Sequence, residues 1–166
     1  DPTINQPDRV PPVINIVSAP ADPTSNPIAS VEFTVTDASP TTAKCKVDEG
    51  EFATCASPFT SAALSDGAHR IMLKATDRWG YVSEEIELNF TVDTVRPVIT
   101  LNGAESLALE LGDTYIELGA RVTDNFDQTL LAMIGGESVD TSIVGTYLVT
   151  YDAVDSHNNP AIQKTR

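Results

Sequence analysis

Residues 84–92 read EEIELNFTV, and polar and apolar side chains alternate along this stretch. Because successive side chains of a β-strand point to opposite faces of its sheet, the pattern predicts a half-buried strand. Its inward-facing residues are Ile86, Leu88, Phe90 and Val92. Val, Ile, Thr, Tyr and Phe recur along the whole chain, interrupted by 11 Pro and 9 Gly, and apolar residues nowhere keep helical spacing over three turns. The sequence therefore predicts an all-β fold.

An internal repeat organises the chain. Residues 8–14 return as 93–99, residues 35–37 return as 122–124, and the pattern of 67–77 returns in 145–155. Three echoes in the same order indicate two copies of one unit, and each copy has the size of a small β-sandwich. We predict a first domain at 1–92 and a second at 93–166.

The expected strands follow from local alternation and turn residues. In the first domain they are 13–17, 31–36, 44–47, 52–54, 59–64, 68–76 and 84–92. In the second they are 98–101, 107–110, 120–123, 134–137 and 147–153, followed by a truncated copy of the last strand. We therefore expect the chain to be a piece of a longer protein.

The charge of the chain narrows its expected partners. Lys and Arg number 10 against 24 Asp and Glu, which gives a net charge of −14. Phosphate groups are bound by clustered Lys and Arg, so we expect neither nucleic acid nor an anionic membrane as a partner. No apolar stretch approaches the roughly 18 residues of a membrane span, so we expect no direct membrane insertion.

The two cysteines flank a turn signal. Cys45 and Cys55 stand at equal distance from Gly50 in the segment 48–51, which is typical of a turn between two strands. A hairpin centred on Gly50 would place the two sulfur atoms opposite each other. We predict a cross-strand disulfide and, from it, an oxidising compartment. A two-cysteine metal site would lack its other ligands, and the spacing does not match a CxxC redox pair.

Five motifs of the second domain occur together in a known family. They are Asp93-x-x-x-Pro97-Val98-Ile99, Leu111-Gly112-Asp113-x-Tyr115, Gly119-Ala120-x-Val122-x-Asp124-Asn125-x-Asp127, Val139-Asp140-Thr141-Ser142-x-Val144-Gly145-Thr146-Tyr147 and Tyr151-x-Ala153-x-Asp155. Over nearly its whole length this domain resembles the Ig-like domains of bacterial surface proteins, which form arrays on adhesins, internalin-like proteins and secreted polysaccharide-degrading enzymes. It departs from the family at Gln128 and at Asn158-Asn159, where glycines are common.

The first domain looks like a related Ig-like type. It carries Cys-x-Val-Asp-x-Gly-x-Phe from Cys45 and Leu-x-Asp-Gly-x-His from Leu64. The resemblance implies two tandem Ig-like Greek-key β-sandwich domains. Tyr147 stands where such a domain has its tyrosine corner, and His69 stands at the same offset from Gly67. The alternative for His69 is a ligand or a base.

The resemblance also places acidic residues together. In an Ig topology the start of the first strand, the end of the second and the loop after the penultimate strand lie at one pole. The residues expected there are Asp8, Asp37 and Asp77 in the first domain, and Asp93, Asp124, Asp127 and Asp155 in the second. Crowded carboxylates repel unless a cation or N–H groups stabilise them, and Ca²⁺ prefers such oxygen ligands. The alternative is that each aspartate caps its own turn by accepting from amides two residues on.

Other functional signals are sparse. Trp79 and Tyr81 lie in a predicted loop, where they could stack on a sugar or anchor a protein partner; alternatively they pack over the edge of their own domain. We find no His/Cys/Asp spacing, phosphate loop or nucleophile elbow, so we expect no enzymatic activity. No cofactor is required, with Ca²⁺ the one candidate ion.

Two functions of different classes remain. The first is a non-catalytic spacer of a bacterial surface adhesin or secreted protein, with the neighbouring domains of that protein as its partners. The second is a module that binds a glycan or a surface protein of a host or neighbouring cell, for example as an accessory domain of a secreted polysaccharide-degrading enzyme. A sugar platform usually carries two or three aromatic side chains on one face, and only Trp79 and Tyr81 qualify here. Either function implies a secreted or cell-surface location.

Overall fold

The computed structural model describes residues 8–166, so the first seven residues of the predicted domain at 1–92 lie outside the described residues. The chain divides into two compact units, Asp1–Asp93 and Thr94–Arg166. This boundary lies one residue after the predicted one. Every regular element in residues 8–166 is a β-strand, as the alternation predicts. No helix in this part of the chain is long and apolar enough to cross a bilayer.

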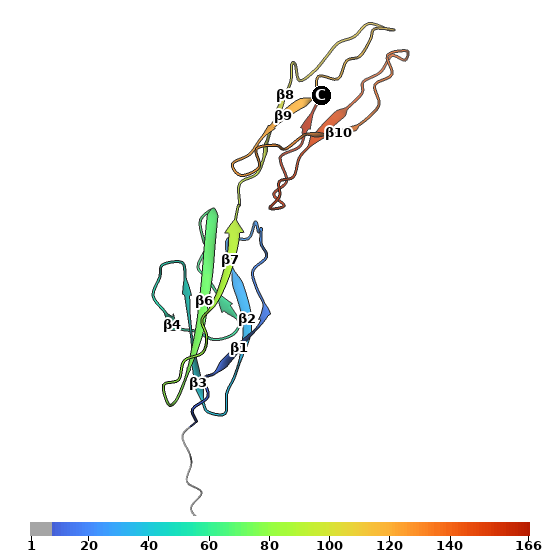
Figure 1. Cartoon of the computed structure of the whole chain (residues 1–166). Coiled ribbons are helices and arrows are strands. Elements are labelled where there is room, and N and C mark those ends of the chain that lie inside the picture. Colours follow the sequence, from blue (N-terminus) through green and yellow to red (C-terminus); the bar gives the residue numbers. More distant parts are fainter. Residues whose placement is uncertain (1–7) are drawn as a thin grey trace, which may run out of the picture. The chain divides into compact units, whose positions relative to one another are not determined.

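The first unit is a sandwich of two antiparallel sheets (Figure 1). One sheet has the order β1 (Val13–Ser18), β2 (Ser30–Thr36), β5 (Phe59–Thr60). The other has the order β4 (Ala53–Thr54), β3 (Thr41–Val47), β6 (Gly67–Asp77), β7 (Ile86–Val92). The chain therefore crosses from one sheet to the other three times, after β2, β4 and β5, as chains do in Ig-like sandwiches.

The core of the first unit lies between these sheets. On β7, Phe90 and Val92 are buried and Ile86 and Leu88 pack partly buried against the same core, as the alternation of residues 84–92 predicts. The remaining buried members are Ile14, Ala29, Val31, Phe33, Cys45, Ile71, Leu73 and Ala75. Strand β6 supplies its part of this core at every second residue, because a strand's side chains alternate between faces.

The second unit has shorter strands and a smaller core. Strands β8 (Val98–Leu101) and β9 (Ala120–Thr123) form one sheet. Strands β10 (Met133–Gly136), β11 (Val149–Asp152) and β12 (Lys164–Thr165) form the other. The buried core consists of Ile99, Val149, Tyr151 and Ala153.

The strand predicted at 107–110 is wrong. This segment has no regular secondary structure, and all four of its residues are exposed. The amide of Glu110 donates to Asp113 Oδ2 and its carbonyl accepts from the amide of Asp113, at 2.9 and 3.0 Å. At Glu110, a local turn therefore uses the backbone amide and carbonyl that a sheet ladder would need.

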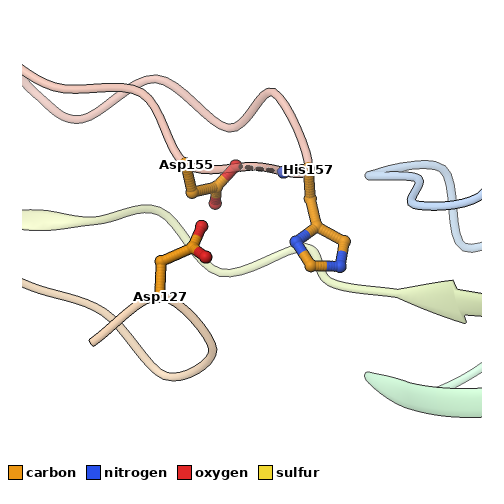
Figure 2. A group of neighbouring side chains, drawn as sticks. All are labelled: Asp127, Asp155 and His157. Carbon is orange, nitrogen blue, oxygen red and sulfur yellow. Dashed lines mark hydrogen bonds between the residues drawn. The ribbon is translucent and has the colours of Figure 1, made fainter. Parts of the chain in front are cut away.

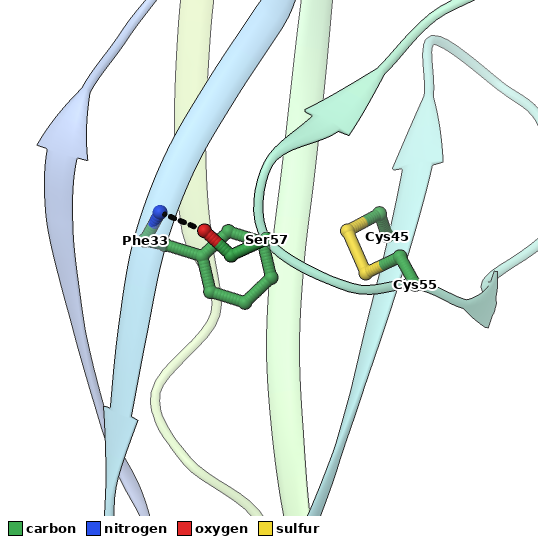
Figure 3. Close-up of a disulfide and its surroundings, with 4 residues drawn as sticks. All are labelled: Phe33, Cys45, Cys55 and Ser57. Atoms are coloured by element: carbon green, nitrogen blue, oxygen red, sulfur yellow. Dashed lines mark hydrogen bonds between the residues drawn. A yellow bond between two sulfur atoms is a disulfide. The ribbon is translucent and has the colours of Figure 1, made fainter.

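The cysteine hairpin forms, and it contains the disulfide between Cys45 and Cys55, with a Cα–Cα distance of 5.7 Å (Figure 3). Its register differs from the predicted one, because Cys45 faces Ala53 and the hairpin is not centred on Gly50. A tight turn explains the difference, since the amide of Gly50 donates to the carbonyl of Val47 at 3.0 Å.

The disulfide lies where the chain changes sheets. Cys55 follows β4, and two residues later Ser57 Oγ accepts a hydrogen bond from the amide of Phe33 on β2 at 2.8 Å (Figure 3). The next strand, β5, then pairs with β2. The disulfide thus fixes one end of a crossing segment whose other end is bonded to the opposite sheet.

Removing the disulfide should destabilise the first unit. Because Cys45 and Cys55 close a loop with a sequence separation of 10, we expect the Cys45→Ala/Cys55→Ala variant to lose about 2–3 kcal/mol of unfolding free energy. Denaturant titration of the whole chain measures the loss. A reductant should destabilise the wild type equally and leave the double variant unchanged. Two titratable thiols in the unfolded, unreduced wild type would contradict the disulfide.

Candidate functional site

Asp77 is a buried carboxylate at the end of β6. It follows Ile71, Leu73 and Ala75 on the inward face of this strand and is 6% exposed. Its Oδ1 accepts hydrogen bonds from the amides of Trp79 and Tyr81, both at 2.8 Å. This oxygen therefore organises the turn that leaves the strand.

Asp8 and Asp37 join Asp77 from two other segments. Asp8 precedes β1 and Asp37 follows β2, and each offers a carboxylate oxygen within 4.8 Å of the others and of one from Asp77. Each also caps its own turn: Asp8 Oδ1 accepts from the amide of Val10 at 3.0 Å, and Asp37 Oδ1 accepts from the amide of Ser39 at 2.7 Å. The hydrogen bonds from the hydroxyl and amide of Ser39 lower the pKa of Asp37.

The second unit repeats these turns. Asp124 Oδ1 accepts from the amides of Phe126 and Asp127, both at 2.9 Å. Asp155 Oδ1 accepts from the amides of His157 and Asn159 at 2.9 and 2.7 Å, the same offsets that Asp77 uses. Two of the three echoes of the sequence repeat, those that end at Asp37 and Asp124 and at Asp77 and Asp155, thus correspond to repeated hydrogen bonds.

A second group of possible ligands contains a histidine that the sequence reasoning did not place there. Asp127, Asp155 and His157 each offer an atom within 4.8 Å of the others, and Asp155 and His157 are buried (Figure 2). Asp127 accepts from the amide and hydroxyl of Ser156 at 2.6 and 3.1 Å, and these hydrogen bonds lower its pKa. The available sequence signal was the closeness of Asp155 and His157 within one turn, where Asp155 Oδ1 accepts from the amide of His157.

Asp93 belongs to the first unit, where its amide donates to the carbonyl of Thr24 at 3.0 Å. Asp124, Asp127 and Asp155 belong to the second unit. The expected meeting of Asp93 with these three stays a prediction.

Turn capping uses only one of the two carboxylate oxygens in three of these aspartates. The Oδ1 atoms of Asp8, Asp77 and Asp124 accept amide hydrogen bonds, as the capping alternative expects. Their Oδ2 atoms are buried and accept no hydrogen bond. A buried oxygen without a donor is costly, so these atoms are the ones that could take a cation.

Trp79 and Tyr81 are partly exposed. Their exposed fractions are 43% and 38%, and the guanidinium of Arg78 lies 4.8 Å from the Trp79 ring centre. Both backbone amides are held by Asp77, so the loop that presents the two rings is fixed at its base. The geometry leaves part of each ring available for contact.

Tyr147 and His69 close equivalent corners. The hydroxyl of Tyr147 donates to the carbonyls of Asp140 and Ile143 at 2.8 and 3.2 Å. His69 Nε2 lies 2.8 Å from the carbonyl of Ser65, and its Nδ1 lies 2.8 Å from Asp48 Oδ2. Burial lowers the pKa of His69, but these hydrogen bonds outweigh burial and raise it above the usual value. His69 is thus engaged on both ring nitrogens, as a corner residue should be.

The sequence reasoning missed a polar network in the second unit. Glu117 Oε1 accepts from Tyr151 Oη at 2.6 Å, from the amide of Gly119 at 2.7 Å and from Arg166 Nη1 at 3.0 Å, while Glu117 Oε2 accepts from Tyr115 Oη. The Arg166 side chain is only 3% exposed. Burial and the contact with Glu117 raise the pKa of Tyr151 to about 12.

Comparisons with known proteins identify the second unit. Residues 99–166 match the family model of the bacterial surface protein, Ig-like domain, which confirms the resemblance recognised in the sequence. Among solved structures, the fibronectin(III)-like modules of Clostridium thermocellum CbhA are similar, with 14% identity, a TM-score of 0.49 and coverage of 92% of this chain and 91% of that chain. No curated protein matches the chain.

Removing the charge of Glu117 should destabilise the second unit. Burial raises the pKa of Glu117, but its hydrogen bonds with Tyr115 and Tyr151 outweigh burial and hold the pKa below the usual value. The stabilising effect of the Glu117 carboxylate is therefore fully present above the pKa that this group has in the unfolded chain. It is lost as the pH falls through the lower pKa that the group has in the folded chain. We expect Glu117→Gln to lose about 1.5–3 kcal/mol at pH 7, measured by denaturant unfolding.

The pH profile provides the control. The variant should show a smaller loss of stability on acidification than the wild type, because it has one depressed carboxyl fewer. The exposed Glu105, changed to Gln, should leave both stability and pH profile unchanged. Equal stability of Glu117→Gln and wild type at pH 7 would refute the role of this network.

Proposed function

We propose that this chain, whose residues 99–166 match a bacterial surface Ig-like domain, is a non-catalytic extracellular spacer within a larger surface or secreted protein. The observation that carries the proposal is the family match of the second unit. Support for extending it to the first unit comes from the repeated aspartate turns at Asp77 and Asp155. Two units built on one plan are what a spacer array requires.

Two further properties suit an extracellular spacer. The disulfide between Cys45 and Cys55 would persist in an oxidising compartment and not in a reducing cytosol. The net charge of −14 favours solubility and weak self-association. Neither property identifies a ligand, and both support a module whose task is to remain folded outside the cell.

A binding module is the second candidate, and one observation favours it. Trp79 and Tyr81 are partly exposed on a loop held by Asp77, and aromatic rings on a fixed loop can stack on sugars or anchor a protein. A sugar platform usually carries two or three aromatic rings on one face, and Trp79 and Tyr81 are at the lower end of that number. We therefore rank the spacer above the binding module.

Force spectroscopy tests the spacer directly. When the chain is pulled from its two ends, we expect two separate unfolding events, one for each unit. A reductant should lengthen one event by about 30 Å, because it releases the loop of sequence separation 10 between the cysteines. The Cys45→Ala/Cys55→Ala variant serves as control and should show the longer event without reductant. A single unfolding event would count against two independent spacer units.

Glycan binding separates the two candidates. For a spacer we expect no saturable binding of soluble polysaccharides or host glycans to the whole chain in calorimetric titration. Saturable binding that disappears in Trp79→Ala, with an unchanged melting temperature, would replace the spacer by the binding module.

A further inference from the structure

One carboxylate oxygen in the core of the first unit lacks a hydrogen-bond donor. Asp77 is 6% exposed, its Oδ1 accepts two amide hydrogen bonds, and its Oδ2 is buried without a partner. An unpaired buried acceptor costs stability, and the cost is larger when the group is ionised. A residue on this inward face would normally be apolar, so the position needs a compensating charge.

The neighbours of Asp77 increase this need. Asp8 and Asp37 each place a carboxylate oxygen within 4.8 Å of one from Asp77, and the Oδ2 of Asp8 is also buried without a partner. Within residues 8–166 none of the three carboxylates forms an ion pair with Lys, Arg or His. Three acidic groups from three segments therefore converge without an ion-pair partner among the described residues.

In the second unit, the aspartate that corresponds to Asp77 has a side-chain donor for its second oxygen. At the equivalent position, Asp155 Oδ2 accepts a hydrogen bond from Asn159 Nδ2 at 2.8 Å. The residue that corresponds to Asn159 in the first unit is Tyr81, which offers Asp77 its backbone amide but no side-chain donor to Oδ2. The amide side chain that satisfies Asp155 is thus missing beside Asp77.

We propose that Asp8, Asp37 and Asp77 bind one Ca²⁺ ion in the first unit. Ca²⁺ binds oxygens at about 2.3–2.6 Å, so two oxygens on opposite sides of the ion stand about 4.6–5.2 Å apart. A spread of up to 4.8 Å fits this span. Opposite ligands of Mg²⁺ stand about 4.0–4.2 Å apart, and Mg²⁺ keeps several waters, which suits a partly buried cluster less well.

The bound ion joins three segments. Asp8 lies in the segment before β1, Asp37 in the connection from β2 to β3, and Asp77 at the start of the loop that carries Trp79. Because Asp77 Oδ1 already holds the amides of Trp79 and Tyr81, an ion on Oδ2 fixes the aromatic loop as well. The inference stands on the first unit alone and holds for either proposed function.

The test uses the whole chain and Ca²⁺ alone, after treatment with EGTA. Trp79 is the only tryptophan, so its fluorescence reports on the first unit during both titration and thermal melting. We expect a saturable change in Trp79 emission and, at a hundredfold excess of Ca²⁺ over Kd, a rise of about 10–20 °C in the melting temperature. Mg²⁺ at the same concentration should give a clearly smaller rise.

Two variants separate a metal ligand from a turn cap. Asp77→Asn keeps an oxygen for the amides of Trp79 and Tyr81 but removes the charge, so it should melt at or above wild type in EGTA and lose the Ca²⁺ response. Tyr81→Asn places the amide of the second unit beside Asp77, so it should raise the melting temperature in EGTA and weaken Ca²⁺ binding at least tenfold. Asp155→Asn, the matched change in the second unit, should leave the Trp79 response unchanged.

Several outcomes would overturn the proposal. They are an absence of any Ca²⁺ effect on Trp79 emission and melting, an equal effect of Mg²⁺, or a full Ca²⁺ response in Asp77→Asn. If Asp77→Asn does not fold, Asp37→Asn decides, because Asp37 is only partly buried. A full Ca²⁺ response in that variant would equally refute the assignment. The outcome is independent of the pulling and glycan experiments, which address the spacer.

Discussion

Strand β6 keeps its two-residue alternation one step beyond its last apolar side chain, and this places a carboxylate where the core ends. Ile71, Leu73 and Ala75 fill the sandwich, and Asp77 follows them on the same face. Its position is fixed by the packing of the strand and not by its own preference for water, because turning it outward would expose the whole apolar row. The turn, the aromatic loop and the acidic cluster all depend on this placement.

A carboxylate has two oxygens, and in these aspartates the two oxygens differ in their hydrogen-bond partners. In both units, one oxygen of the aspartate near the end of the penultimate strand, Asp77 or Asp155, accepts two amide hydrogen bonds and shapes the turn. The other oxygen must be satisfied by a side chain, a cation or water. The two alternatives considered for these aspartates, turn caps and metal ligands, are therefore compatible, because each concerns a different atom of the same group.

Much of the fold could be predicted because the alternation of polar and apolar residues and the internal repeat are visible directly in the sequence. The face of residues 84–92, the hairpin between the cysteines and the equivalence of Asp77 with Asp155 all follow from local spacing. The unpaired segment at 107–110 could not, because its turn depends on Asp113 capturing the backbone of Glu110. Contacts between residues distant in sequence could not be predicted either, because Arg166 contacts Glu117 only once the sheets have formed.

The comparison of Asn159 with Tyr81 shows how two copies of one plan can differ in their dependence on solution conditions. A carboxamide donor belongs to the chain and is present whenever the chain is folded, so the satisfaction of Asp155 Oδ2 does not vary with the medium. An oxygen without such a donor depends on what the medium supplies. The difference lies in one side chain at the end of a strand and leaves the strands and their core unaltered. Under the proposed Ca²⁺ assignment, the side chain four residues after the aspartate therefore decides whether its second oxygen needs a cation, and the fold is the same in both cases.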